Sequence, residues 1–75
     1  MKKAFEEKFL LMVTADIRKI FKDEKSITEN YFEIWMYLNE VIDSVIDNAS
    51  ESLLTELYIL RCEYQYKYLK NKGLI

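Results

Sequence analysis

The chain has 75 residues, a formal net charge of −2, and 51% hydrophobic with 32% charged residues, which is typical of a folded domain and not of a disordered segment. It has no proline and one glycine, Gly73, so the residues on which sheet turns depend are missing. The absence of histidine excludes His-based catalytic triads and most zinc sites. We therefore expect one all-α domain over residues 1–75, an up-down-up three-helix bundle or a helical hairpin plus an N-terminal helix, with no enzymatic activity and no cofactor.

The single cysteine, Cys62, cannot form a disulfide within the chain and indicates a reducing compartment. The apolar run from Phe9 to Val13 is short and follows the acidic pair Glu6 and Glu7, so we expect no signal peptide. No stretch approaches the ~18 uncharged residues that a membrane-spanning helix needs. These features predict a cytoplasmic protein.

The first predicted helix covers residues 3–23. Its apolar residues recur at helical spacing and predict one buried side, made of Phe5, Phe9, Met12, Val13, Ile17, Ile20 and Phe21. Asp16 interrupts this side, one turn from Ile20. Because an isolated buried carboxylate is costly, we expect Asp16 to find a basic or hydrogen-bonding partner, or to lie at an unfilled edge of the bundle.

The second predicted helix covers residues 27–48. Ser26 and Glu29 have capping-box spacing at its start, although Thr28 is a competing cap. Apolar residues alternate at intervals of mostly three and four, which is typical of nearly antiparallel packing in a bundle. We expect this seam to contain Ile27, Tyr31, Ile34, Leu38, Val41, Ile42, Val45 and Ala49.

Several bulky residues of the second helix lie outside that seam and among carboxylates. Interfaces favour aromatic and methionine side chains, so this group resembles a protein-binding surface. The predicted partner-binding residues are Phe32, Trp35, Met36, Glu33, Glu40 and Asp43. The structural alternative is that the first helix or a second copy of the chain covers Phe32 and Trp35.

The third predicted helix covers residues 51–71, with Asn48 and Glu51 at capping-box spacing before it. No glycine or proline separates it from the second helix, so one continuous helix over 27–71, in an exchanged dimer, is an alternative. It has two apolar stripes: Leu53, Leu57, Leu60, Tyr64 and Tyr68, and then Leu54, Tyr58, Cys62 and Leu69. We expect the second stripe to mediate a homodimer, with Cys62 as a small buried hydrophobic residue. The alternative for Cys62 is an intermolecular disulfide or a reactive thiol.

Charge is segregated along the chain, because residues 26–56 contain seven acidic side chains and no basic ones. We expect a regulator that inhibits or adapts a protein partner. Small acidic helical proteins without catalytic residues often come from phages, mobile elements or bacterial regulatory circuits, and we expect a phage-like or mobile-element-like origin by analogy alone. The alternatives are a structural assembly subunit, or a nucleic-acid-associated regulator that uses basic residues of the first and third helices: Lys19, Lys22, Lys25, Lys67, Lys70 and Lys72.

Overall fold

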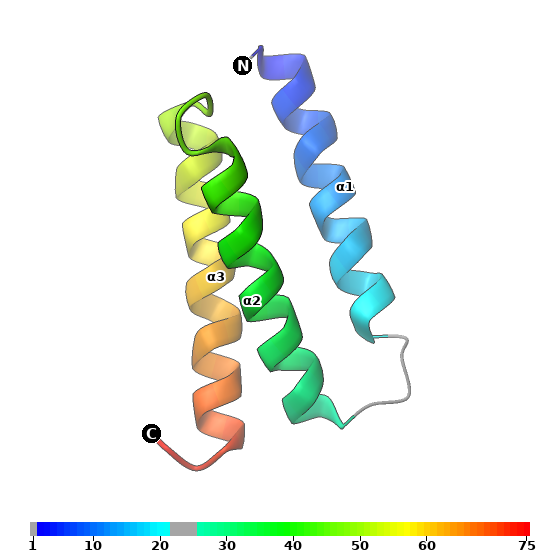
Figure 1. Ribbon diagram of the computed structural model, residues 1–75, viewed down its shortest axis with the longest axis vertical. Coiled ribbons are helices and arrows are strands. Elements are labelled where there is room, and N and C mark those ends of the chain that lie inside the picture. The colour runs from blue at the N-terminus through cyan, green and yellow to red at the C-terminus, as the bar shows by residue number, and fades with distance from the viewer. Residues whose placement is uncertain (1, 22–25) are drawn as a thin grey trace.

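The computed structural model describes residues 2–21 and 26–75, and these residues form three α-helices and no strand. The helices are α1 (Lys3–Phe21), α2 (Ile27–Val45) and α3 (Glu51–Asn71), and they lie side by side in Figure 1. The all-helical prediction is therefore confirmed. Residues 22 and 23, predicted to end the first helix, lie outside the described residues. α2 ends three residues before the predicted position 48, and α3 has the predicted bounds.

Local capping accounts for the start of α2 and the end of α3. The Ser26 side chain accepts a hydrogen bond from the Glu29 amide at 3.2 Å, which confirms Ser26 as the N-cap. At the other end, Gly73 has a positive φ of 77°. Its amide donates to the Lys70 carbonyl and the Leu74 amide donates to the Leu69 carbonyl. These two bonds form a Schellman motif, which explains why the only glycine stands at this position.

A turn separates α2 from α3, so the two helices are not continuous. The cap predicted at Asn48 is wrong, because Ser50 is the N-cap of α3 and accepts from the Leu53 amide at 3.2 Å. Residues after Val45 form a tight turn instead, with the amides of Asn48 and Ala49 both donating to the Val45 carbonyl. Residues 46–48, which the sequence pattern assigned to the end of the second helix, belong to this turn.

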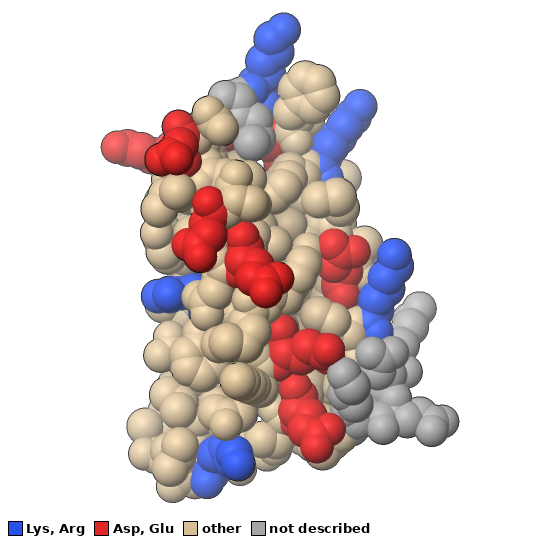
Figure 2. Space-filling view, viewed as in Figure 1, with Lys and Arg blue, Asp and Glu red and all other residues tan. Residues whose placement is uncertain are grey.

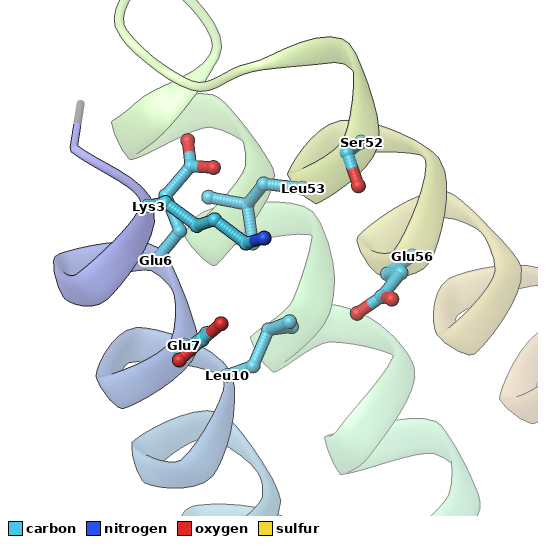
Figure 3. A pocket seen from close by; sticks show the side chains of 7 residues that line it. All are labelled: Lys3, Glu6, Glu7, Leu10, Ser52, Leu53 and Glu56. Atoms are coloured by element: carbon cyan, nitrogen blue, oxygen red, sulfur yellow. The ribbon is translucent and has the colours of Figure 1, made fainter.

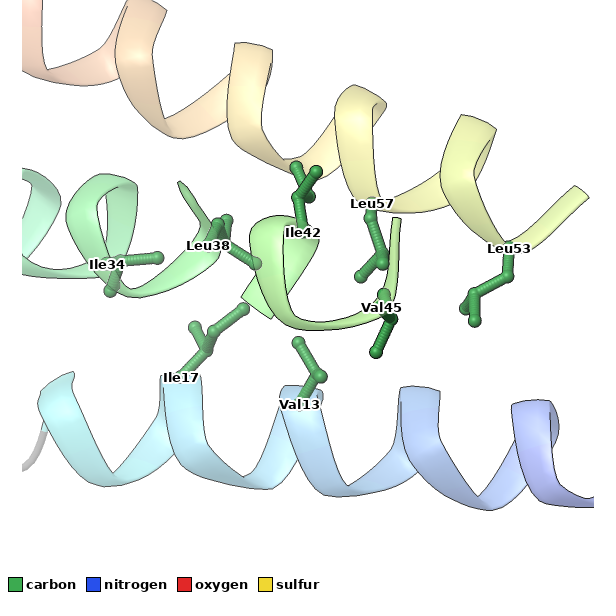
Figure 4. Close-up of a cluster of buried hydrophobic side chains, with 8 residues drawn as sticks. All are labelled: Val13, Ile17, Ile34, Leu38, Ile42, Val45, Leu53 and Leu57. Carbon is green, nitrogen blue, oxygen red and sulfur yellow. The ribbon is translucent and has the colours of Figure 1, made fainter. Parts of the chain in front are cut away.

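The core is built from all three helices, whose buried side chains point toward one another in Figure 4. Val13 and Ile17 come from α1, and Leu53 and Leu57 come from α3. The α2 contribution confirms the centre of the predicted seam: Ile34, Leu38, Ile42 and Val45. These eight aliphatic side chains, with the partly buried hydrophobic residues packed against them, supply the hydrophobic stabilisation of the fold.

The helices form a flattened array with dimensions of 39 × 25 × 14 Å. α2 packs most extensively against α3 and also contacts α1. α1 meets α3 near both ends, through Glu6 and Ser50 at one end and the rings of Phe21 and Tyr64, 6.2 Å apart, at the other. Between these contacts lies a hollow lined by Leu10, Thr14, Glu56, Ile59 and Leu60.

The apolar side predicted for α1 is only partly covered. Val13 and Ile17 are buried, but Phe5 is 63% exposed and Met12 is 51% exposed. Ile27, at the start of the predicted α2 seam, is also exposed. α1 rests mainly on α2, and a helix with one main neighbour buries only the centre of a wide apolar arc, so Phe5 and Met12 stay at the surface.

Candidate interaction surfaces

The predicted partner-binding residues lie on α2, and carboxylates gather over this helix in the middle of Figure 2. Phe32 and Met36 are each 36% exposed. Together with Glu29 and Glu33 they line a shallow hollow. Glu40 is exposed one turn beyond Met36, and Asp43 is exposed further along the helix. We call these predicted residues (Phe32, Glu33, Trp35, Met36, Glu40 and Asp43) the α2 patch.

The aromatic part of the α2 patch is fixed by α3. The Tyr68 ring lies 5.3 Å from the Phe32 ring and 5.7 Å from the Trp35 ring, measured between centroids. Phe32 and Trp35 also pack edge to face at 6.1 Å. The predicted structural cover of these residues was α1 or a second copy, whereas the contact comes from α3. Phe32 is thereby held in place while a third of its surface remains accessible.

A second apolar surface lies on the side of α3 that faces away from the core. Tyr58 is 38% exposed, Ile59 63% and Tyr66 54%, and Cys62 is also exposed. Thr55, exposed as well, lies on the same side one turn before Ile59. We call these five residues and Leu69 the α3 outer face.

The structure separates the predicted self-association residues into two groups. Tyr58 and Cys62 are exposed, whereas Leu54 and Leu69 are half-buried. Cys62 is exposed in the single chain, so the prediction that it is buried is wrong there. Ile59 and Tyr66 were not predicted as self-association residues. Their positions beside Cys62 on a helical wheel are the signal that could have identified them.

Glu6 is buried although it is charged, and its carboxylate serves the start of α3. It accepts hydrogen bonds from the Ser50 amide at 2.9 Å and from the Ser50 hydroxyl at 2.6 Å. Figure 3 shows Glu6 beside a hollow between the first turns of α1 and α3, lined also by Lys3, Glu7 and Glu56. Ser50 is the N-cap of α3, so these two hydrogen bonds attach α1 to the start of α3. Glu6 therefore has a structural role.

We predict that this contact makes stability depend on pH. The hydrogen bonds from the Ser50 hydroxyl and amide lower the pKa of Glu6 from its usual 4.5. A carboxylate whose pKa is lower in the folded state than in the unfolded state adds stability at pH values above the unfolded-state pKa. This added stability is lost as the pH falls through the folded-state pKa. In wild type the free energy of unfolding should therefore fall as acid is added below pH 4.5.

Urea unfolding at a series of pH values measures this dependence. Glu6→Gln should lower stability at neutral pH and flatten the acid-side slope. Glu7→Gln removes a neighbouring exposed carboxylate and should keep the wild-type slope. Equal slopes in wild type and Glu6→Gln would show that the Ser50 contact does not couple folding to protonation of Glu6.

Asp16 has the hydrogen-bonding partner that the sequence predicted. It accepts a hydrogen bond from the Tyr37 hydroxyl at 2.6 Å, which links α1 to α2. Burial of the Tyr37 ring and this bond to Asp16 raise the pKa of the Tyr37 hydroxyl, so it remains a donor at physiological pH. The interruption of the α1 apolar side is therefore a structural contact.

Among the described basic residues proposed for nucleic-acid contact, Lys67 is half-buried. The Lys67 amine lies 4.9 Å from the centre of the Tyr64 ring and 5.9 Å from that of Tyr31, an arrangement that favours cation–π attraction. Lys19, Lys70 and Lys72 are exposed. Residues 22 and 25 lie outside the described residues. Of these described lysines, Lys19 lies on α1, Lys67 and Lys70 lie on α3, and Lys72 follows α3.

Among residues 2–21 and 26–75, no group of three or more Cys, Asp or Glu side chains is arranged to hold a metal ion. None of the three helices, as described, is long and apolar enough to cross a membrane. Comparison with protein-family models, with curated proteins and with solved structures finds no significant match to the chain.

Proposed function

We propose that this chain is a non-enzymatic, cytoplasmic helical protein that binds a protein partner and regulates it by inhibiting or adapting it. The α2 patch is the proposed partner-binding surface. The α3 outer face is proposed to join two copies into a homodimer. Each dimer then carries two α2 patches.

The observation that supports partner binding is the pair of apolar side chains left accessible among carboxylates on α2. Phe32 and Met36 are each about a third exposed beside Glu29 and Glu33. Aromatic and methionine side chains in a polar surround are the composition of many interface centres. The rigid support that Tyr68 gives to Phe32 reduces the entropy lost on binding. The acidic surround favours a partner with a basic surface around an apolar anchor.

We predict that Met36→Ser weakens partner binding at least about tenfold, since a dominant interface residue contributes about 2 kcal/mol and about 1.4 kcal/mol corresponds to a factor of ten. Met12→Ser is the matched control, because Met12 is also exposed but lies on α1. Trp35 is left unchanged because its ring packs against Tyr68. Tagged wild type and both variants are used to capture proteins from the native host, and the affinity for each captured protein is then measured with purified components.

A protein that binds wild type and Met12→Ser but is lost with Met36→Ser supports the proposal. Equal binding to all three baits would place the contact outside the α2 patch. Loss of helicity in Met36→Ser, measured by circular dichroism, would assign Met36 to the fold and contradict the proposal. Binding of wild type to duplex DNA that falls steeply with added salt would support the nucleic-acid alternative instead.

A further inference from the structure

We infer that the partner on the α3 outer face is a second copy of α3 running in the opposite direction, with Cys62 at the two-fold axis. This inference rests on the proposed homodimer and specifies how the two chains pair. The exposed side chains that define the surface are Thr55, Tyr58, Ile59, Cys62 and Tyr66. Such a surface on a helix of 21 residues is long enough for helix–helix packing.

The order of residues along this surface is nearly symmetric about Cys62. Tyr58 and Tyr66 each lie four residues from Cys62, and Thr55 and Leu69 each lie seven residues from it. In an antiparallel pair centred on Cys62, Tyr58 of one copy is therefore level with Tyr66 of the other, and Thr55 is level with Leu69. Cys62 is small, so the two helices can approach closely where they cross, with the tyrosine rings packing on either side.

Charge favours the antiparallel direction. Glu51 lies in the first turn of α3 and Lys70 lies in its last turn, with Lys72 directly after it. An antiparallel pair brings the acidic first turn of each helix beside the basic last turn of the other, whereas a parallel pair in register brings like charges together. The opposed helix dipoles add to this preference. The same segregation favours a second copy over an unrelated partner, because α3 complements itself.

Disulfide mapping tests both the direction and the register. In a Cys62→Ser background, cysteine is introduced in two separate variants, Thr55→Cys and Leu69→Cys. Each variant alone and an equal mixture of the two are oxidised with copper phenanthroline and separated under non-reducing conditions. The mixture should give a cross-linked dimer of Thr55→Cys with Leu69→Cys, and each variant alone should give at most a tenth as much. Circular dichroism verifies that each variant is folded.

A mass measurement at tens of micromolar chain separates failure of this inference from failure of the homodimer. A monomer of 9.1 kDa overturns both the proposed homodimer and the pairing inferred from it. A dimer in which each variant cross-links efficiently to itself overturns the antiparallel direction and leaves the homodimer intact. A dimer without any cross-link places its interface away from the α3 outer face and also overturns the inference.

Discussion

Leu38→Ala should lower the free energy of unfolding by about 2–5 kcal/mol, the cost of deleting a buried leucine side chain and leaving a cavity. Leu38 has no exposed surface and lies on α2, between the other two helices, where α1 and α3 both pack against the core. Domains of this size are marginally stable, with about 0.05–0.15 kcal/mol per residue. The substitution is therefore expected to remove a large part of the total stability.

Leu11→Ala is the matched control, since Leu11 lies on α1 with 71% of its surface exposed. Its stability should stay within about 0.5 kcal/mol of wild type. Both variants are unfolded with urea and followed by circular dichroism, at one fixed chain concentration because self-association would stabilise the folded state. Similar losses in the two variants would show that Leu38 does not lie in the core.

The central part of the fold could be predicted from the sequence. Apolar residues at helical spacing lie on one side of a helix, and they are buried where another helix packs against that side. Ile34, Leu38, Ile42 and Val45 recur at intervals of three or four residues, and all four are buried. Ser26 was predicted as a cap because its spacing to Glu29 has a local physical meaning. Such features depend on a few adjacent residues and need no knowledge of how the helices are arranged.

The predictions that were wrong concern burial and capping that depend on how the three helices pack together. Phe5 and Met12 belong to the α1 apolar stripe, but α2 covers only the centre of that stripe and leaves both exposed. Asn48 has capping-box spacing, yet Ser50 caps α3 and also binds Glu6 from α1. The periodicity of a single helix gives the angular position of a side chain but does not show which neighbour lies there.

The α2 patch and the α3 outer face were predictable in different degrees. The bulky residues among carboxylates on α2 could be identified from sequence, but their contact with Tyr68 links positions 32 and 68, which no local pattern connects. On α3, the excess of apolar residues indicated an uncovered side, and Tyr58 and Cys62 were assigned to it. Ile59 and Tyr66 were missed because they belong to neither of the two apolar stripes predicted for the third helix. The exposed apolar face is broader than either stripe.

Replacing both Tyr58 and Tyr66 with Asp should convert the proposed homodimer into a monomer. In the antiparallel pairing these positions come level with each other from the two copies, so the double variant would bring four carboxylates into one desolvated interface. Loss of the aromatic contacts and the cost of burying unpaired charge should weaken the dimer at least about a hundredfold, given about 2 kcal/mol for each dominant interface residue. Both side chains are exposed in the single chain, so the fold should tolerate the change.

Analytical ultracentrifugation at several chain concentrations, with circular dichroism of the same samples, distinguishes loss of association from loss of folding. Phe5→Asp is the control, because Phe5 is 63% exposed on α1 and outside the proposed interface. Wild type and Phe5→Asp should sediment with twice the chain mass of 9.1 kDa, and the double variant should sediment with the chain mass at unchanged helicity. A double variant that remains dimeric would show that association does not use the α3 outer face, since no dimer could bury four aspartates there without a large loss of affinity.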